Sequence, residues 1–548
     1  MFAKASHQDR FSSQRFSVGI WLFGVAICTM FSILSFRLIE MQLIQGSEYR
    51  AKADQNRFFT RYLPASRGVF FDRTGKVLVR NKPLYKKATP ETAGKPYPKF
   101  IQIHEQEALT GIVEDQRNIV LDQQREYLYG ESLSLLLGFI GEATKEELTA
   151  YKEFYLGESI GKFGLEKTYQ SKLAGKTGEE VYEMDAMGNL LRVVNKKSAI
   201  SGVDVQLTID ASLSAKAYEL LDGKKGAIVA SDPRTGEILA LVSSPAFDPT
   251  KIQESLSNPN SPFLNRAISG TYPPGSTFKL MTALSGLAHN AINIDTKVID
   301  EGVLKVGEFS FGNWYFSQYG RTEGEVDLVK ALQRSNDIFF YKVAEWVGPE
   351  KLAETARQFH FGVINGIELN GEAAGLIPDP AWKEQTKGEK WFLGNTYHMG
   401  IGQGDVLATP LQINQATAAI ANDSVWCKPK IVSSTQQECT ELHISADDLA
   451  LVRKGMEAAC SEGGTAYPFF DHKPVAVRCK TGTAEFGPQD EKGRRKTHAL
   501  FTMAAPAENP EIVITVVLEG TEEQKFLEGS KDAGPIAKKL LEEWFSKR

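Results

Sequence analysis

The first long apolar stretch of the chain lies close to its N-terminus. Residues 16–36 carry no charge and are rich in Ile, Leu, Phe and Val, between Arg15 and Arg37. As a helix, this segment would be about 31 Å long, which matches the hydrocarbon core of a bilayer. We therefore predict an uncleaved transmembrane anchor at these residues. A cleaved signal peptide and a buried core helix are the alternatives, but no A-x-A cleavage site follows the segment.

Between this anchor and residue 200, the chain is polar and mixed in character. Glu146 and Glu147 begin a helix-like stretch. Residues 82–99 contain four prolines and five lysines. Because proline lacks the N–H that a central strand donates, we predict an exposed loop there. A loop of this charge can also touch acidic lipid headgroups, although a solvated loop is the simpler interpretation.

The next part of the chain shows clearer patterns of strands and helices. Asp204–Asp210 alternates between polar and apolar residues as a strand does, and a helical pattern follows it to Leu221. Two further strands are predicted at Gly226–Ser231 and Glu237–Ser243. The segment between them, Pro233–Gly236, has the composition of a turn.

The C-terminal part predicts strands and a helix again. Val475–Cys479 alternates as a half-buried strand, Ile512–Leu518 is typical of a buried strand, and Ile536–Phe545 has the pattern of an amphipathic helix. Strands and helices at both ends of a mostly helical middle imply an α+β fold. Its expected core is an antiparallel sheet covered by helices.

Composition limits the class of protein. Hydrophobic content of 42%, charged content of 24% and a net charge of −5 describe an ordinary folded protein, long enough for several domains. They give no sign of a nucleic-acid-binding surface. C-x-x-C is absent and the 8 histidines form no close pairs, so no metal site is predicted.

Four of the five cysteines lie late in the chain. Cys427 and Cys439 are near enough in sequence to close a small loop. Cys460 with Cys479 could tie a helix to the strand that follows. Disulfides are permitted outside the cell, and free buried thiols are the alternative.

The most informative stretch for chemistry is an S-x-x-K sequence, Ser276 to Lys279, which follows Tyr272-Pro273-Pro274-Gly275. A serine and a lysine three positions apart lie on one face of a helix. Proline and glycine suit a helix start, where free N–H groups favour an oxyanion on the Ser276 hydroxyl. Lys279 can act as its base if burial or a second cation lowers its pKa. The alternative is an exposed lysine one turn after a cap serine.

Two more short motifs follow in order. Ser335-Asn336-Asp337 precedes an apolar run that predicts a buried helix. These residues suit a helix N-cap, but a hydroxyl such as that of Ser335 can also relay a proton. Lys480-Thr481-Gly482-Thr483 follows the alternating segment near residue 475.

A second K-T-G lies at Lys176-Thr177-Gly178. It is surrounded by charged residues, has no strand pattern before it, and precedes the S-x-x-K. We therefore predict that Lys480 belongs to the functional copy and that Lys176 is a loop lysine.

In this order, the three motifs resemble those of the class B penicillin-binding proteins, which are serine D,D-transpeptidases of bacterial wall synthesis. The resemblance covers nearly the whole chain. Further segments similar to landmarks of that family are Arg67–Gly75, Gly161–Glu166, Asn265–Ala267, Gly400–Gly404, Thr409–Gln412, Gly464–Ala466 and His498–Ala499.

The resemblance is greater to the elongation, rod-shape type than to the division type. Two prolines before Gly275, aspartate at Asp337 and the sequence Gly161–Glu166 look like the elongation type. The division type usually has an acidic residue where Pro273 stands and asparagine where Asp337 stands. The stretch from residue 80 to residue 125 is shorter than in many elongation enzymes.

The resemblance implies a domain order and a location. Residues 1–15 would be a cytoplasmic tail, 16–36 the anchor, 37–202 an elongated, non-catalytic pedestal or dimerisation-type domain, and 203–548 a transpeptidase domain with a serine β-lactamase-like fold. The protein would cross the inner membrane once, with its catalytic domain in the periplasm or outside the cell.

The resemblance also implies roles for single residues. Ser276 would be the nucleophile, Lys279 its base, and Ser335 with Lys480 a proton relay to the leaving group. Backbone N–H groups of Ser276 and Thr483 would form the oxyanion hole. The residues expected to bind substrate beside them are Asp337, Thr481, Gly482 and Thr483. Because Asp337 replaces the commoner asparagine, it could instead pair with a lysine and raise that lysine's pKa.

The expected partners are peptidoglycan stem peptides as donor and acceptor, β-lactams as inhibitors, the membrane, a SEDS-type glycan polymerase and other cell-shape proteins. No nucleic acid and no cofactor are expected. The alternatives are a division-type transpeptidase, a D,D-carboxypeptidase or β-lactamase-like hydrolase, a β-lactam sensor, and a non-catalytic scaffold that activates a glycan polymerase.

Overall fold

The computed structural model describes residues 10–89, 100–114, 119–150, 159–185, 190–471 and 475–546. The chain forms two compact units. The first comprises residues 1–66, 83–123 and 176–200, and the second comprises residues 67–82, 124–175 and 201–548. Residues 1–9 of the predicted cytoplasmic tail and residues 90–99 of the predicted loop lie outside the described residues.

The first unit begins with the helix α1 (Arg10–Ile39), which continues into η1 (Glu40–Ile44) and is followed by α2 (Gly46–Arg57). Val18–Ile44 is long and apolar enough to cross a membrane. Its apolar side chains are exposed, and Trp21 is 76% exposed. A helix therefore includes the whole predicted anchor, and its length and composition fit a membrane span.

Two groups of strands complete the first unit. β1 (Phe58–Leu63), β8 (Gly178–Met184) and β9 (Leu190–Lys197) form an antiparallel sheet in the order β1-β8-β9. The other elements here are β4 (Phe100–Ile103), α3 (Glu105–Glu114) and the first part of β5 (Ile119–Tyr127), whose residues from 124 on belong to the second unit.

The predicted loop at residues 82–99 is wrong in its first part, because β3 (Val77–Ala88) runs through it. β3 pairs with β2 (Phe70–Phe71) through Val77 and Val79, and with β4 through Tyr85 to Ala88. Pro83 lies between these two ladders, so its missing N–H interrupts neither of them. β3 also pairs with β5.

The second unit opens with short elements that meet at a buried carboxylate. Glu166 is fully buried and forms ion pairs with Arg67 at 2.6 Å and with Arg125 at 2.8 Å. The two segments Arg67–Gly75 and Gly161–Glu166 therefore meet at Glu166. The elements around it are α4 (Glu131–Leu137), β6 (Ile140–Glu142), α5 (Lys145–Ala150), β7 (Ser159–Gly161), α6 (Gly164–Thr168) and α7 (Gln170–Leu173).

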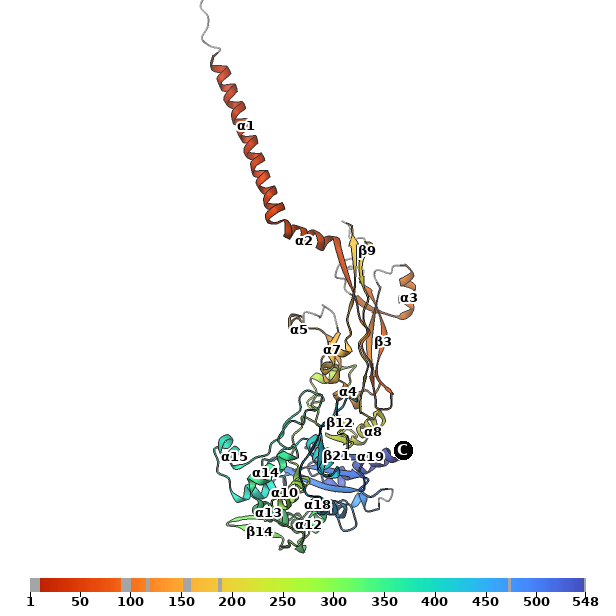
Figure 1. The fold of residues 1–548 in the computed structure, drawn as a ribbon, viewed down its shortest axis with the longest axis vertical. Helices are drawn as coiled ribbons and strands as arrows, with labels where there is room; N and C mark the ends of the chain where they lie inside the picture. The colour runs from red at the N-terminus through yellow and green to blue at the C-terminus, as the bar shows by residue number, and fades with distance from the viewer. Residues whose placement is uncertain are drawn as a thin grey trace, which may run out of the picture. The chain divides into compact units, whose positions relative to one another are not determined.

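A five-stranded antiparallel sheet forms part of the second unit, in the order β12-β11-β21-β20-β19. Two of its strands, β12 and β21, are labelled in Figure 1. Its strands are β11 (Gly226–Ser231), β12 (Ile238–Ser244), β19 (Arg478–Phe486), β20 (Lys496–Ala505) and β21 (Ile512–Leu518). The predicted antiparallel sheet is therefore confirmed, and β11, β12 and β21 lie close to their predicted bounds.

Helices cover both faces of this sheet, because alternate residues of each strand point to opposite sides. Phe501 and Val516 are cross-strand partners that pack with α8 (Ala211–Leu221) and α19 (Gly534–Ser546). The next pair, Leu500 and Val517, belongs to the cluster on the other face, with the helix α10 (Lys279–Ala288). The helix at Ile536–Phe545 is thus confirmed as part of α19.

The region between β12 and β19 is mostly helical. Its helices are α9 (Ile252–Leu256), η2 (Gly275–Phe278), α10, α11 (Trp314–Tyr319), α12 (Leu328–Arg334), α13 (Asp337–Val347), α14 (Pro349–Gln358), α15 (Pro380–Lys387), α16 (Leu393–Gly400), α17 (Pro410–Ala421), α18 (Ala446–Ala459) and η3 (Tyr467–Phe469). Short strand pairs lie among them, namely β13 (Val298–Asp300) with β16 (Gly324–Val326), β14 (Val303–Val306) with β15 (Phe309–Gly312), and β17 (Val425–Cys427) with β18 (Cys439–Glu441). The π-helical turn η4 (Gly529–Ala533) precedes α19.

Two predicted strands are shorter than expected. Of Asp204–Asp210, only β10 (Val205–Gln206) is a strand, paired in parallel with β2. Thr208 leaves that ladder because its N–H donates to Ile431 O at 2.7 Å. Of Val475–Cys479, only the last two residues belong to β19, because Ala476 O instead accepts the N–H of Ala507, in the loop after β20.

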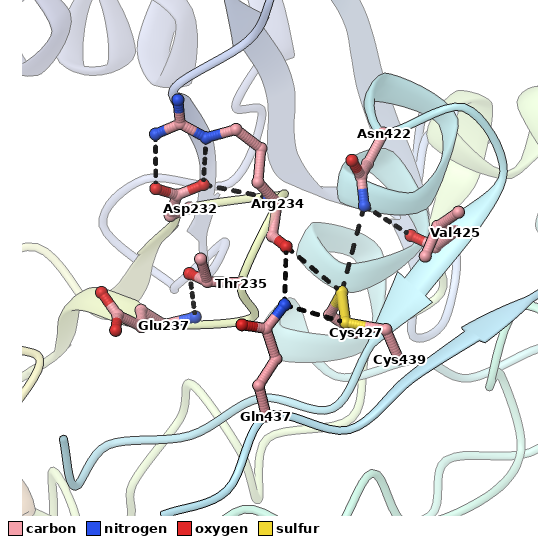
Figure 2. The surroundings of a disulfide bond; sticks show 9 residues. All are labelled: Asp232, Arg234, Thr235, Glu237, Asn422, Val425, Cys427, Gln437 and Cys439. Carbon is pink, nitrogen blue, oxygen red and sulfur yellow. Dashed lines mark hydrogen bonds and ion pairs between the residues drawn. A yellow bond between two sulfur atoms is a disulfide. The ribbon is translucent and has the colours of Figure 1, made fainter. Parts of the chain in front are cut away.

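The four late cysteines form two disulfides, Cys427–Cys439 and Cys460–Cys479. Figure 2 shows the first, where the strands β17 and β18 meet their connecting loop, and against the turn between β11 and β12. Gln437 in the disulfide loop donates from Nε2 to Arg234 O in that turn, at 3.1 Å. Both pairings considered from the sequence are therefore present, and the alternative of free buried thiols is wrong for these four residues.

Candidate active site

Ser276 lies in η2, a single turn of 3₁₀-helix, and Lys279 is the first residue of α10. The predicted helix start is therefore confirmed, with the difference that its first turn is 3₁₀. Residues three apart eclipse each other in a 3₁₀ turn, so Ser276 and Lys279 leave the backbone on the same side. Ser276 is half-buried, whereas Lys279 is fully buried. Among the described residues, no hydrogen bond joins the two side chains.

Two glycines let other backbone segments approach Ser276 closely. Gly275 has φ +53°, and its N–H donates to Gly402 O at 2.8 Å. A Cβ on Gly402 would lie 2.3 Å from Gly275 O, which no side chain can occupy. A Cβ on Gly275 would lie 3.2 Å from Thr483 O, so the backbones of the S-x-x-K and K-T-G segments are neighbours.

The ammonium group of Lys279 is held from the second motif. Its Nζ donates to Asp337 Oδ1 at 2.6 Å, to Ser335 O at 2.8 Å and to Ser335 Oγ at 3.3 Å. Ser335 follows α12 in the left-handed conformation, with φ +53°. This turn points both its carbonyl and its hydroxyl at Lys279.

Lys480 reaches the same hydroxyl from the opposite side. It lies in β19, is fully buried, and donates from Nζ to Ser335 Oγ at 2.9 Å. Ser335 Oγ therefore lies between two lysine amines. The three motifs, which are far apart in sequence, converge on this hydroxyl.

Burial disfavours the charged form of both lysines. It lowers the pKa of Lys279, while the charge of Asp337 and its hydrogen bond act in the opposite direction. Burial lowers the pKa of Lys480 well below its ordinary value, and the nearby Lys279 lowers it further, against a weaker effect of Asp337. Both amines that contact Ser335 Oγ therefore lose a proton more readily than the amine of an exposed lysine does.

β19 is the last strand in the order of its sheet, so among the described strands it has a neighbour on one edge only. Its Gly482 faces η2, since a Cβ there would lie 3.0 Å from Thr277 Cγ2. Thr481 and Thr483 point to the other face, where Thr481 Oγ1 lies 2.9 Å from Thr465 Oγ1 and Thr483 Oγ1 accepts the N–H of Gly529 at 3.2 Å.

The structure thus brings most of the predicted site residues together. The residues in mutual contact are Ser335, Asp337, Lys279 and Lys480, with Ser276, Thr481, Gly482 and Thr483 on the adjoining turn and strand. Lys176 is exposed, and its backbone pairs with Ile200 in the first unit, which fits the predicted loop lysine.

Three residues of the site region carried no recognisable signal in the sequence. Asp300, Asn313 and Trp314 bind the Ser335–Asp337 turn through hydrogen bonds. They precede the turn by more than twenty positions and belong to no short motif. Within the described ranges, no cluster of three or more His, Cys, Asp or Glu side chains could hold a metal ion.

Comparison with known proteins agrees with this geometry. A family model described as "Penicillin binding protein transpeptidase domain" matches residues 226–542, which is more than half of the chain. A second, described as "Penicillin-binding Protein dimerisation domain", matches residues 97–207. The chain belongs to the class B penicillin-binding proteins.

Several curated relatives of this penicillin-binding protein share one name. The chain is 30% identical to the peptidoglycan D,D-transpeptidase MrdA of Acinetobacter baumannii, over 97% of this chain and 87% of that relative. It is 28% identical to MrdA of Escherichia coli, over 90% of this chain and 89% of that relative. Since these relatives are of the elongation type, the predicted subtype is confirmed.

Solved structures of the family confirm the α+β fold. The penicillin-binding protein PBP2 of Helicobacter pylori, in complex with MreC, has a TM-score of 0.77 and 26% identity, and the match covers 89% of this chain and 99% of that one. PBP2 of Pseudomonas aeruginosa, in complex with WCK 5153, has a TM-score of 0.71 and 29% identity, over 88% and 96% of the two chains.

Proposed function

We propose that this protein is a membrane-anchored serine D,D-transpeptidase that crosslinks peptidoglycan stem peptides during cell elongation. The observation that carries the proposal is the contact of Lys279 and Lys480 with one hydroxyl, Ser335 Oγ, beside the half-buried Ser276. Acyl transfer needs a nucleophile, a base and a route for a proton to the leaving group, and this cluster supplies all three.

In the first half of the reaction, Ser276 Oγ attacks the carbonyl carbon between the two terminal D-alanines of a stem peptide. Lys279 accepts the hydroxyl proton. The C–N bond then breaks, and the terminal D-alanine leaves with a proton that passes from Lys279 through Ser335 and Lys480. The products of this half are an acyl-enzyme on Ser276 and free D-alanine.

In the second half, the side-chain amine of a neighbouring stem peptide attacks the acyl carbon. The new amide bond is the crosslink, the ester bond to Ser276 Oγ breaks, and the hydroxyl regains its proton. Water can replace the amine only if it reaches the ester, so an amine acceptor and exclusion of water distinguish a transpeptidase from a hydrolase.

The substrate lies along β19 in this proposal. Lys480, Thr481 and Thr483 bind the terminal carboxylate, while Gly482 lets β19 pack closely against Thr277. An edge strand suits an extended peptide, which can add to the sheet through main-chain hydrogen bonds. The close approach of Gly275 to Thr483 supports an oxyanion hole formed by the N–H groups of Ser276 and Thr483.

The proposed location is the inner membrane, crossed once by α1, with residues 1–15 in the cytoplasm and the catalytic domain in the periplasm. We place the pedestal at residues 37–202 and the transpeptidase domain at residues 203–548, an order supported by the two family models. We propose a SEDS-type glycan polymerase and other cell-shape proteins as partners. The complex of the Helicobacter pylori relative with MreC supports partners of this kind.

Intact-mass analysis after exposure to benzylpenicillin tests the proposal. The wild-type protein should gain the mass of one drug molecule, and Ser276→Ala should gain none. Ser257→Ala, at an exposed serine outside the site, is the matched control and should label like the wild type. Labelling of Ser276→Ala, or no labelling of the wild type, would refute the assignment and favour a scaffold without catalytic activity.

The lifetime of the adduct separates a transpeptidase from a β-lactamase-like hydrolase. A transpeptidase should keep the drug bound for minutes or longer, whereas a hydrolase should release it and turn over. Crosslinking of two labelled stem peptides by the wild type, and not by Ser276→Ala, would complete the assignment.

A further inference from the structure

We propose that Asp300 is a positioning residue for acyl transfer. It holds the turn of residues 335–337 in place against Lys279 by hydrogen bonds to the side chains of Asn313 and Asn336. The inference rests on the proposed function, because it concerns the same site. Asp300 itself contacts none of Ser276, Lys279, Ser335 and Lys480 through a hydrogen bond in the part of the chain that the structure describes.

The carboxylate of Asp300 is buried at the end of β13, with 2% of the residue exposed. No cation pairs with it among the described residues. Four N–H donors satisfy it instead: Oδ1 accepts from Gly302 N at 2.7 Å, while Oδ2 accepts from Asn313 Nδ2 at 2.7 Å, Asn336 Nδ2 at 2.8 Å and Glu323 N at 3.1 Å. A buried carboxylate is tolerated only with such partners, so this group fixes the direction of each donor.

Asn336 links Asp300 to the turn of residues 335–337. Its Nδ2 donates to Asp300, and its Oδ1 caps α13 by accepting the N–H of Phe339 at 2.9 Å. An amide held at both ends cannot rotate, and the residues on either side of it are Ser335 and Asp337. Ser335 has a left-handed backbone, which a residue with a Cβ keeps only when its surroundings hold it there.

Asn313 links Asp300 to Asp337, whose carboxylate contacts Lys279. Its Nδ2 donates to Asp300, and its Oδ1 accepts the N–H of Asp337 at 3.2 Å. The next residue, Trp314, donates its N–H to Asp337 Oδ2 at 2.9 Å, which leaves Oδ1 for Lys279. A continuous path of hydrogen bonds therefore runs from Asp300 through Asn313 and Asp337 to the proposed base.

The chemistry of the path requires a carboxylate at position 300. All four partners present N–H groups, and a carboxylate has only acceptor oxygens. Asparagine has the same shape, but its NH₂ group would face one or more of these donors. Asp300→Asn therefore removes the hydrogen-bond pattern while keeping the volume of the side chain. Glu301→Gln, at the adjacent exposed carboxylate, makes the same chemical change outside the path.

The first test is the rate of acylation of the full-length protein in detergent by a fluorescent penicillin. We expect Asp300→Asn to lower the limiting acylation rate about ten- to hundredfold, because a small displacement of a reacting group has an effect of this size. The constant for the preceding noncovalent complex should change by less than about threefold, because β19 keeps its carboxylate contacts. Glu301→Gln should behave like the wild type.

The second test is the pH profile of acylation, which a merely structural role would not move. The charged groups facing Lys279 Nζ are Asp337 and Lys480, while the side chain of the neighbouring Glu323 pairs with Arg334. If Asp337 is displaced, Lys279 loses the group that keeps it protonated, so the acid limb should move to lower pH in Asp300→Asn. A slower reaction with an unmoved limb would overturn the proposal.

The third test exchanges the two partners. Asn336→Asp keeps the cap on α13 but places a second carboxylate against Asp300, and Asp300→Asn in the same chain restores one donor–acceptor pair. We expect the double variant to acylate at least about tenfold faster than Asn336→Asp alone, since residues in one network are not additive. Additive losses would overturn the direct pairing.

The outcomes distinguish a failure of the proposed function from a failure of the role of Asp300. Failure of the wild type and Glu301→Gln to acylate would refute the proposed function. Normal acylation of the wild type, with Asp300→Asn equally fast, would refute only the role of Asp300. If Asp300→Asn and Asn313→Ala were both unfolded at the assay temperature by circular dichroism, the cluster would be a folding element and the positioning role would be overturned.

Discussion

Asp337 Oδ1 lies 2.6 Å from Lys279 Nζ, and the lysine is fully buried. The aspartate of the second motif therefore pairs with the proposed base. Its other oxygen accepts the N–H of Trp314. This pairing was one of the two roles expected for Asp337, and the structure favours it over a free side chain that binds the substrate amide.

Asp337→Asn should move the acid limb of the acylation profile to lower pH. The carboxylate raises the pKa of Lys279 against the lowering by burial. Without it, the lysine loses its proton at a lower pH and is available as a base there. The measurement is the rate of labelling by a fluorescent penicillin between about pH 5 and pH 9, a range around the ordinary working pH of a tuned base.

Asp327→Asn is the control for this experiment, because Asp327 caps α12 and has no contact with Lys279. The acid limb of the acylation profile of Asp327→Asn should lie at the same pH as that of the wild type. An acid limb that stays in place in Asp337→Asn would contradict the prediction, and an alkaline limb that moves to lower pH instead would show that Lys279 acts in its charged form.

The sequence predicted the motif residues of the site better than the residues that hold them in place. Ser276, Ser335 and Lys480 stand in motifs whose order and spacing are informative without a structure. Asp300 and Asn313 do not, because a hydrogen bond between distant segments leaves no periodic or local pattern. The pairing of Asp337 with Lys279 could be named as an option, but only coordinates distinguish it from an amide-binding role.

The fold, too, was predicted from the sequence only in part. Three strands of the central sheet, β11, β12 and β21, could be predicted because they are mostly apolar, as at Ile512–Leu518. β20 was not predicted, and only the first two residues of β19 were. The strand at Asp204–Asp210 was predicted too long, since alternation continues past Gln206, where the backbone turns to bond Ile431. The strand through Pro83 was missed because the effect of a proline depends on which N–H groups its neighbours need.

Glu166→Gln should destabilise the second unit by about 3 kcal/mol, because it leaves Arg67 and Arg125 without a compensating charge in a buried place. Both guanidinium groups lie within 2.8 Å of the carboxylate. The measurement is the free energy of unfolding in urea. Glu384→Gln, at an exposed glutamate in α15, should change it by less than about 0.5 kcal/mol. Equal effects of the two changes would contradict the role of Glu166.

Removal of the Cys427–Cys439 disulfide should lower stability by about 3 kcal/mol, the value expected when a short loop is no longer closed in the unfolded chain. The two cysteines are separated by 12 positions, and their loop contacts the β11–β12 turn (Figure 2). The double change Cys427→Ser, Cys439→Ser tests this by urea unfolding. Cys28→Ser, at the exposed free cysteine, should have no effect on the same transition.

His498 should make the fold sensitive to acid. Burial lowers its pKa to about 4, against the effect of Glu519, and its Nδ1 accepts the N–H of Gly520 at 3.2 Å. Its contribution to stability is therefore complete above about pH 6.5 and is lost as the pH falls to about 4. Between these values, the wild type should lose about 3 kcal/mol that His498→Phe does not lose.

Denaturant unfolding of both proteins at each pH measures this difference. The substituted ring keeps the stack on Phe486, whose centroid lies 3.9 Å from that of His498. Parallel losses in the two proteins would show that other groups cause the sensitivity.

The chain passes between its two compact units five times, after residues 66, 82, 123, 175 and 200. A single cut near residue 203 would therefore not release an intact catalytic half. It would discard β2, the strand alongside β10, together with the salt bridge between Arg67 and Glu166. A soluble enzyme for drug screening should instead start at residue 67, with short flexible linkers in place of residues 83–123 and 176–200.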